Sequence, residues 1–191
     1  MKNRRSFITG LKSTVLQSIE IRFLKKYKPW GVILFSRNIK SIEQTKKLTD
    51  DIKKIFNDKK YPILIDQEGG RVNRLSKFID TSKFTGEFFG NLYKNNFKKF
   101  VTYYKIYIIQ TCYLMHILGV NINTVPVLDV RNKKSHNIIG DRAFSTNPKI
   151  VSKIGDFCIK EFHKNNIGTV IKHIPGHGLA KVDSHKATPL I

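Results

Sequence analysis

The chain has 191 residues, of which 40% are hydrophobic and 11% aromatic, enough for one sizeable core. This composition excludes a disordered tail, and the length predicts a single domain over residues 1–191. The formal net charge of +21 raises nucleic acid, an anionic membrane or a polyanionic glycan as partners. Lysine outnumbers arginine 27 to 8 and is spread along the whole chain, which favours a bias in composition over a dedicated polyanion surface.

The sequence predicts a cytoplasmic protein. Its N-terminus is basic, but polar residues interrupt the segment after it, so we expect no signal peptide. No run approaches the roughly 20 apolar residues that a membrane-spanning helix needs. Cys112 and Cys158 lie in apolar, helix-like segments without a CxxC pairing, and we expect both to be buried free thiols in a reducing compartment.

Strand-like and helix-like segments alternate along the chain. Short apolar runs predict buried strands at residues 31–35, 62–66, 120–130 and 168–173. Helical periodicity predicts helices over 41–56 and 96–118 and a third from Pro148, with Ser41 and Asn147 as N-caps. The strand–helix–strand rhythm indicates an α/β fold with a parallel sheet.

Polar residues come after each predicted strand. In parallel α/β folds the ligand site is built just beyond the carboxyl ends of the strands. The segments that fall there are 37–38, 66–74, 129–131 and 172–185. We therefore expect these four segments to converge on one site.

The segment 66–74, Asp-Gln-Glu-Gly-Gly-Arg-Val-Asn-Arg, places two carboxylates and two guanidinium groups around a glycine pair. Glycines permit a positive φ and a close backbone approach to a ligand. A carboxylate at a strand end can accept sugar hydroxyls, and an arginine fork can grip a hydroxyl pair or a carboxylate. An internal ion-pair network that only stabilises the turn explains the same residues equally well.

The segment 140–145 again places an arginine, Arg142, beside an aspartate, Asp141, ahead of the capped helix. A lone Asp–Arg pair of this kind is more often structural than functional.

The segment 172–185 concentrates histidines in a Gly/Pro-rich loop. His173, His177, Asp183 and His185 offer imidazole and carboxylate groups to a metal, but Pro175 breaks the regular helix that common metal motifs require. Acid–base chemistry is the alternative: Asp183 can orient His185 as a proton shuttle, with Lys172 and His173 holding substrate oxygens. A loop whose histidines do nothing is the third interpretation.

Six blocks occur in a fixed order: GVILFSRN (31–38), IDQEGGRVNRL (65–75), NINTVPVLDV (121–130), IGDRAFS (139–145), KHIPGHG (172–178) and DSH (183–185). Read together, they resemble the bacterial β-N-acetylhexosaminidases of glycoside hydrolase family 3, cytoplasmic enzymes that recycle cell-wall muropeptides. The resemblance implies the N-terminal part of a (β/α)8 TIM-type barrel, incomplete here because about four strands are recognisable.

The resemblance also implies roles for individual residues. His185 matches the general acid/base and Asp183 the aspartate that orients it. The residues that match the positions binding the N-acetylglucosamine unit are Asp66, Arg74, Arg142, Lys172 and His173. The implied reaction removes a terminal β-linked N-acetylglucosamine with retention, and it needs no metal and no cofactor.

The family's nucleophile, an aspartate in an Asp-Asp-Leu-like turn after a later strand, has no match in this chain. We therefore expect a chain truncated before the nucleophile-bearing strand, with a separate chain as a possible source of the missing half. A catalytically inactive remnant and a basic nucleic-acid-binding module remain as alternatives. The second of these lacks a recognition-helix or RNA-stacking signature.

Overall fold

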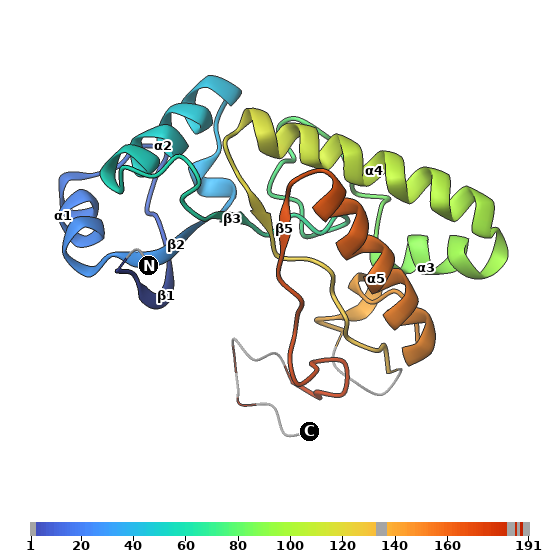
Figure 1. Cartoon of the computed structure of the whole chain (residues 1–191). Coiled ribbons are helices and arrows are strands. Elements are labelled where there is room, and N and C mark those ends of the chain that lie inside the picture. The colour runs from blue at the N-terminus through green and yellow to red at the C-terminus, as the bar shows by residue number, and fades with distance from the viewer. Residues whose placement is uncertain (1–2, 133–136, 183–185, 187, 189–191) are drawn as a thin grey trace.

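The computed structural model describes residues 3–132, 137–182, 186 and 188. Within them, the chain builds a parallel sheet in which each strand pairs with the one before it (Figure 1). The strands are β1 (Arg5–Gly10), β2 (Pro29–Leu34), β3 (Ile63–Ile65), β4 (Ile122–Asn123) and β5 (Gly168–Thr169). The α/β class is confirmed, and the sequential parallel order is the one that a (β/α) barrel requires.

The expected number of strands was too low: the described residues contain five strands instead of four, and β1 is the one that was not predicted. This strand lies at the edge of the sheet and pairs only with β2 among the described strands. Its side chains are exposed or half-buried, with Ile8 45% exposed. A strand without a buried face leaves no apolar run in the sequence, which is why the pattern did not reveal it.

The helices are α1 (Ser18–Tyr27), α2 (Ile42–Ile55), α3 (Gly86–Asn95), α4 (Phe97–Ile117) and α5 (Pro148–Lys164). Helices α1 and α2 lie beside strands β1 and β2, and the other helices are grouped at the opposite end of the sheet, beyond β4 and β5 (Figure 1). The predicted caps of α2 and α5 are confirmed, since Ser41 accepts from the Gln44 amide at 3.2 Å and Asn147 from the Lys149 amide at 2.9 Å. Helices α1 and α3 were not predicted.

Helix α3 approaches the segment around the short helix η2 (Gly140–Arg142) unusually closely. A Cβ added at Gly90 would lie 1.7 Å from the Phe144 carbonyl oxygen, and one added at Gly86 would lie 2.1 Å from that of Arg142. Phe89 packs against Tyr104, with the two ring centroids 4.3 Å apart. These contacts fix the position of the backbone at Arg142, from which its side chain extends.

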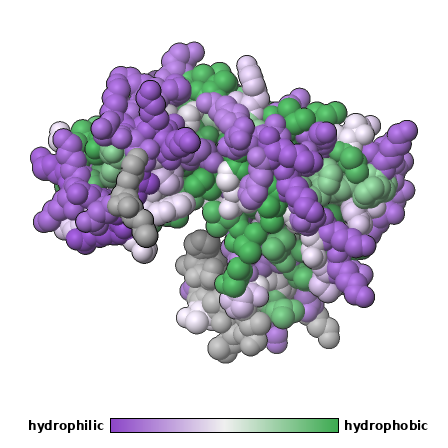
Figure 2. Space-filling view, in the orientation of Figure 1, coloured by the Kyte–Doolittle hydropathy of each residue, from purple (hydrophilic) through white to green (hydrophobic). Residues whose placement is uncertain are grey.

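Apolar surface gathers around the segment that follows β5 (Figure 2). Val170 and Ile171 are about two-fifths exposed there, and Ile174 is 76% exposed. In the part of the chain that is described, no helix combines the length and apolar character needed to cross a bilayer. Cys112 and Cys158 are both buried free thiols, as expected.

Candidate functional site

Residues just beyond three neighbouring strands form one connected group of side chains, which we call the site cluster. Its members are Asp66, Glu68, Arg74, Thr124, Asp129, Arg142, Lys172 and His173. Asp66 directly follows β3 and Thr124 directly follows β4. Lys172 comes three residues after β5, where its backbone bridges to Val127 in parallel register. Three of the four segments predicted to converge, 66–74, 129–131 and the described part of 172–185, therefore meet at the carboxyl edge of the sheet. The fourth, 37–38, does not join the cluster, because Arg37 and Asn38 donate to the Leu11 carbonyl instead.

Asp66 is the acceptor at the centre of the cluster. Its Oδ1 accepts from the Lys172 ammonium and, at 2.8 Å, from the Thr124 hydroxyl, while its Oδ2 lies 3.0 Å from Arg74 Nη2. Burial opposes ionisation of this carboxyl, but Lys172, Thr124 and Arg74 together outweigh burial and lower the pKa of Asp66 below its ordinary 3.8. The carboxylate is therefore held charged and oriented.

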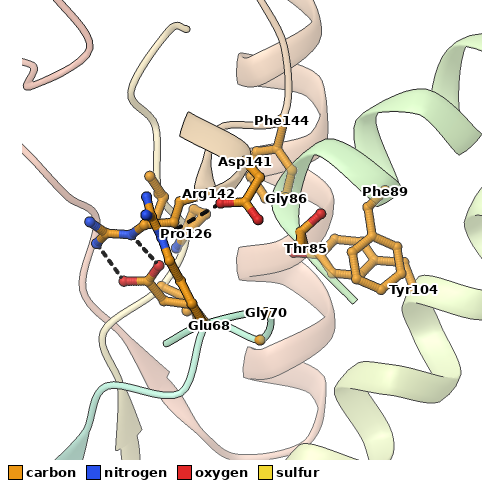
Figure 3. Close-up of a pocket in the computed structure, with 14 residues that line it drawn as sticks. Glu68, Gly70, Thr85, Gly86, Phe89, Tyr104, Pro126, Asp141, Arg142 and Phe144 are labelled. Carbon is orange, nitrogen blue, oxygen red and sulfur yellow. Dashed lines mark hydrogen bonds and ion pairs between the residues drawn. The ribbon is translucent and has the colours of Figure 1, made fainter. Parts of the chain in front are cut away.

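Glu68 joins two cations that come from different parts of the chain. Its Oε2 accepts from Arg142 Nε and its Oε1 from Arg142 Nη2, both at 2.8 Å, a two-pronged pairing visible in Figure 3. The same Oε1 lies 2.5 Å from Lys172 Nζ. Burial opposes the charge of Arg142, but the Glu68 carboxylate outweighs burial and raises the pKa of that guanidinium.

A small cavity lies behind the Glu68–Arg142 pair, with Phe89, Tyr104 and Phe144 among its walls (Figure 3). Its volume of about 30 Å³ is far below the roughly 300 Å³ from which ligand pockets begin. This space is too small to enclose a sugar. The Glu68 and Arg142 side chains that line it are 6% and 13% exposed, and this burial strengthens their electrostatic interaction.

His173 is oriented by a fully buried aspartate. Its Nδ1 lies 2.6 Å from Asp129 Oδ2, and the other oxygen of Asp129 accepts from the His177 backbone amide. Burial opposes ionisation of Asp129, but the contacts from His173 and the His177 amide outweigh it and lower the pKa of Asp129. The second ring nitrogen of His173 faces Arg142 Nη2 at 3.5 Å and is left pointing into the cluster.

Acid titration tests the role of Asp129. Because its pKa is lower in the folded than in the unfolded chain, its carboxylate contributes stability fully above the ordinary value of 3.8 and loses that contribution as the pH falls through the folded pKa. The free energy of unfolding of the wild type should exceed that of Asp129→Asn at about pH 5, and the gap should shrink below about pH 4.

Urea unfolding at several pH values measures that gap. Asp156→Asn serves as the control, because Asp156 pairs with Lys160 on an exposed helix face, with both side chains more than 60% exposed. This control should differ little from the wild type at any pH. A gap for Asp129→Asn that widens below about pH 4 would contradict the assignment.

The segment 66–74 is held by amide side chains that sequence reasoning passed over. Buried Asn123 accepts from the Gln67 amide at 3.0 Å and donates to the Gln67 carbonyl at 2.9 Å. The Gln67 side chain in turn accepts from the Arg74 amide at 2.9 Å, closing the loop. The positive φ expected of the glycine pair is confirmed, with φ of +99° at Gly69. The close approach there is to the chain itself and not to a ligand, since a Cβ would lie 2.3 Å from the Phe84 carbonyl oxygen.

Asp141 and Arg142 do not pair with each other, in contrast to the structural Asp–Arg pair expected from their adjacency. Arg142 pairs with Glu68, and Asp141 lies 3.6 Å from Arg71 Nε. Arg71 also donates to the carbonyls of Asn137 and Ile138. Neighbouring side chains at a turn point in different directions, so both residues reach across to the loop after β3 instead.

The structure brings together all five residues matched to sugar binding: Asp66, Arg74, Arg142, Lys172 and His173. Asp183 and His185, the predicted acid/base pair, lie outside the described residues. Sequence reasoning placed Glu68 and Asp129 in the strand-end segments 66–74 and 129–131 but gave neither an individual role, and it did not single out Thr124. Thr124 lies within a predicted strand, where its hydroxyl gave no separate signal.

The described members of the cluster carry balanced charge, which limits the kind of ligand. Three cations (Arg74, Arg142 and Lys172) face three carboxylates (Asp66, Glu68 and Asp129). In a chain of +21 this local balance is exceptional and does not suit a phosphate or polyanion. Fixed donors and acceptors side by side suit a neutral ligand rich in hydroxyl groups. Among the described residues, no group of three His, Cys, Asp or Glu could hold a metal ion.

Known proteins agree with this chemistry. Residues 11–191 match the model of the glycosyl hydrolase family 3 N-terminal domain. The chain is 36% identical over 182 residues to a beta-hexosaminidase of Hydrogenovibrio crunogenus, covering 93% of this chain and 49% of that protein. It is 34% identical over 173 residues to beta-hexosaminidase A of Pseudoalteromonas piscicida, covering 88% of this chain and 28% of that protein. The chain thus spans about half or less of these relatives.

Solved structures show the same fold. NagZ from Neisseria gonorrhoeae, crystallised with N-trifluoroacetyl-D-glucosamine, superposes with a TM-score of 0.87 at 28% identity. The match covers 97% of this chain and 54% of that one. The sheet order, the cluster at its carboxyl edge and these matches lead to one conclusion. The chain belongs to glycosyl hydrolase family 3 and carries that family's N-terminal domain over residues 11–191.

Proposed function

We propose that this chain provides the N-acetylglucosamine-binding part of a retaining β-N-acetylhexosaminidase that acts on cell-wall muropeptides. The observation that carries the proposal is the site cluster: the five residues matched to sugar binding converge at the carboxyl edge of the sheet, oriented by three further side chains. Residues 1–191 act in this proposal as a single domain.

Each cluster member has a part in holding a neutral sugar. Asp66 accepts sugar hydroxyls, because its lone pairs are fixed by Lys172 and Thr124 and its charge strengthens each bond. Arg142 and Lys172 donate to sugar oxygens. His173, fixed through Asp129, presents its second ring nitrogen beside Arg142 Nη2. Such oriented groups bind without the cost of ordering flexible side chains.

In the proposed reaction, His185 protonates the leaving oxygen and then deprotonates water, with Asp183 orienting its imidazole. The retaining route also needs a carboxylate nucleophile, and after Glu161 the sequence contains only Asp183 as an acidic residue. We therefore expect these 191 residues to bind the sugar but not to turn it over, with the nucleophile supplied by other sequence, in the same or a separate chain.

The other interpretations have less support. In a decaying remnant, we would expect the charged residues of the site to lose their counter-ions, yet Asp66, Glu68 and Asp129 each keep an ion-pair partner. A polyanion-binding module gains nothing from a balanced cluster at its sheet edge. The two buried free thiols support a reducing compartment and hence the cytoplasm.

Calorimetry with N-acetylglucosamine and a chromogenic β-N-acetylglucosaminide tests the proposal. We expect saturable sugar binding by the purified chain, lost in Lys172→Met, and no release of chromophore. Lys153→Met is a matched control, because Lys153 lies exposed on α5 away from the cluster. Absence of sugar binding would reject the proposal. Turnover by this chain alone, abolished by His185→Ala, would reject the part that concerns the nucleophile.

A further inference from the structure

We propose that Glu68 sets the charge specificity of the site: its carboxylate neutralises Arg142, shares Lys172 with Asp66, and so reserves both cations for an uncharged sugar, excluding phosphorylated or carboxylated ones. This inference rests on the proposed function, but its electrostatic content can be tested separately. It concerns which sugars enter, a question that the matched sugar-binding residues leave open.

The position of Glu68 makes it a shared counter-ion. Its side chain is only 6% exposed, and those of Arg142 and Lys172 are 13% and 14% exposed. Both of its oxygens are engaged by Arg142, and one of them also contacts Lys172. A carboxylate this buried, with cations on two sides, interacts with both more strongly than it would in water.

The other carboxylates of the cluster form their ion pairs elsewhere than at Arg142. Asp66 pairs with Arg74 and shares Lys172 with Glu68, and Asp129 pairs with His173. Among the described residues, Glu68 is thus the carboxylate in ion-pair contact with Arg142. Removing its charge leaves a local excess of +1, centred on the Arg142 fork.

An unpaired Arg142 fork next to the Lys172 ammonium is the arrangement that recognises phosphate. Arginine binds such an oxyanion through two parallel N–H groups, and lysine adds a point charge. With Glu68 present, an incoming phosphate must displace or face a buried carboxylate, and like-charge juxtaposition rejects it. A neutral hydroxyl meets no such penalty.

Glu68→Gln tests this directly, because glutamine keeps the shape and one acceptor oxygen while removing the charge. Calorimetry would measure the affinity of inorganic phosphate and of N-acetylglucosamine for the wild type, Glu68→Gln, Glu68→Asp and Glu87→Gln. Glu87 is the control: it pairs with Arg131 outside the cluster, and its side chain is 44% exposed.

We expect Glu68→Gln to bind phosphate about tenfold more tightly than the wild type or more, since even a screened unit charge at this range is worth a factor of that size. Glu68→Asp, which keeps the charge, and Glu87→Gln should both resemble the wild type. Phosphate binding by Glu68→Gln no stronger than that of Glu87→Gln would overturn the inference. Failure of the wild type to bind N-acetylglucosamine would instead overturn the proposed function.

A measurement on the unaltered chain covers the case in which Glu68→Gln does not fold. The wild type should bind N-acetylglucosamine at least about tenfold more tightly than N-acetylglucosamine 6-phosphate at about pH 7.5, where the phosphate carries nearly two charges. Equal affinity for the two sugars would overturn the inference without any substitution.

Discussion

Asp66→Asn is expected to weaken N-acetylglucosamine binding by about 30-fold or more while leaving the chain folded. Hydrogen bonds to a charged acceptor are worth about 1.5–3 kcal/mol, and losing the charge of one carboxylate that receives sugar hydroxyls removes about 2 kcal/mol. The asparagine oxygen still accepts from Thr124, and Lys172 keeps Glu68 as a partner. Arg74 loses its carboxylate partner, but its side chain is 27% exposed and can be hydrated, so no fully buried cation is left unpaired.

Calorimetric titration with the sugar measures the loss, and the thermal midpoint reports folding. Asp50→Asn provides the same chemical change at a half-exposed helical pair with Lys46, where we expect no change in either quantity. Binding by Asp66→Asn within about threefold of the wild type would show that the carboxylate does not contact the sugar.

Gly90→Ala is expected to destabilise the fold by about 3 kcal/mol or more, against the general preference for alanine in helices. In an open helix this change gains about 1 kcal/mol. Here the new methyl group would lie 1.7 Å from the Phe144 carbonyl oxygen and 2.7 Å from its carbon, both backbone atoms that cannot rotate away. Either α3 or the segment carrying Arg142 must move, with overpacking costs of the size seen in tight cores.

Asn91→Ala on the same helix separates the clash from helix propensity, because Asn91 is exposed. In urea unfolding, the free energy of unfolding of Gly90→Ala should be clearly lower than that of the wild type, and that of Asn91→Ala should be equal to it or slightly higher. A Gly90→Ala protein as stable as the wild type would mean that α3 does not approach Phe144 as closely as described.

Periodicity was enough to predict the elements whose burial is one-sided or complete. Strands β2 and β3 are buried runs, and α2 and α5 have capped, amphipathic patterns, so each left a signal in the sequence. Strand β1 left none, because it is exposed. Helix α3 left none either, because Gly86 and Gly90 lower its local propensity and only packing against the η2 segment explains them.

The location of the site was predictable from the sequence, but the pairing of its side chains was not. The predicted strand ends located Asp66 and Lys172, which are 106 residues apart in the sequence and pair in the structure. The partner of Arg142, in contrast, lies 74 residues away at Glu68 rather than next door at Asp141. Spacing along the chain carries no information on which of two carboxylates a guanidinium will reach. Only the fold, which brings the ends of β3, β4 and β5 side by side, decides it.

The balanced charge of the site cluster has a consequence for ionic strength. Neutral-sugar binding releases no counterions, so its affinity should stay nearly constant as salt screens the +21 surface over a Debye length of about 10 Å or less. Adsorption to DNA, driven by that surface alone, should instead fall steeply with added salt. A salt titration therefore measures two independent properties of one chain: the diffuse positive charge that the composition produces, and the charge-balanced site cluster that the fold assembles.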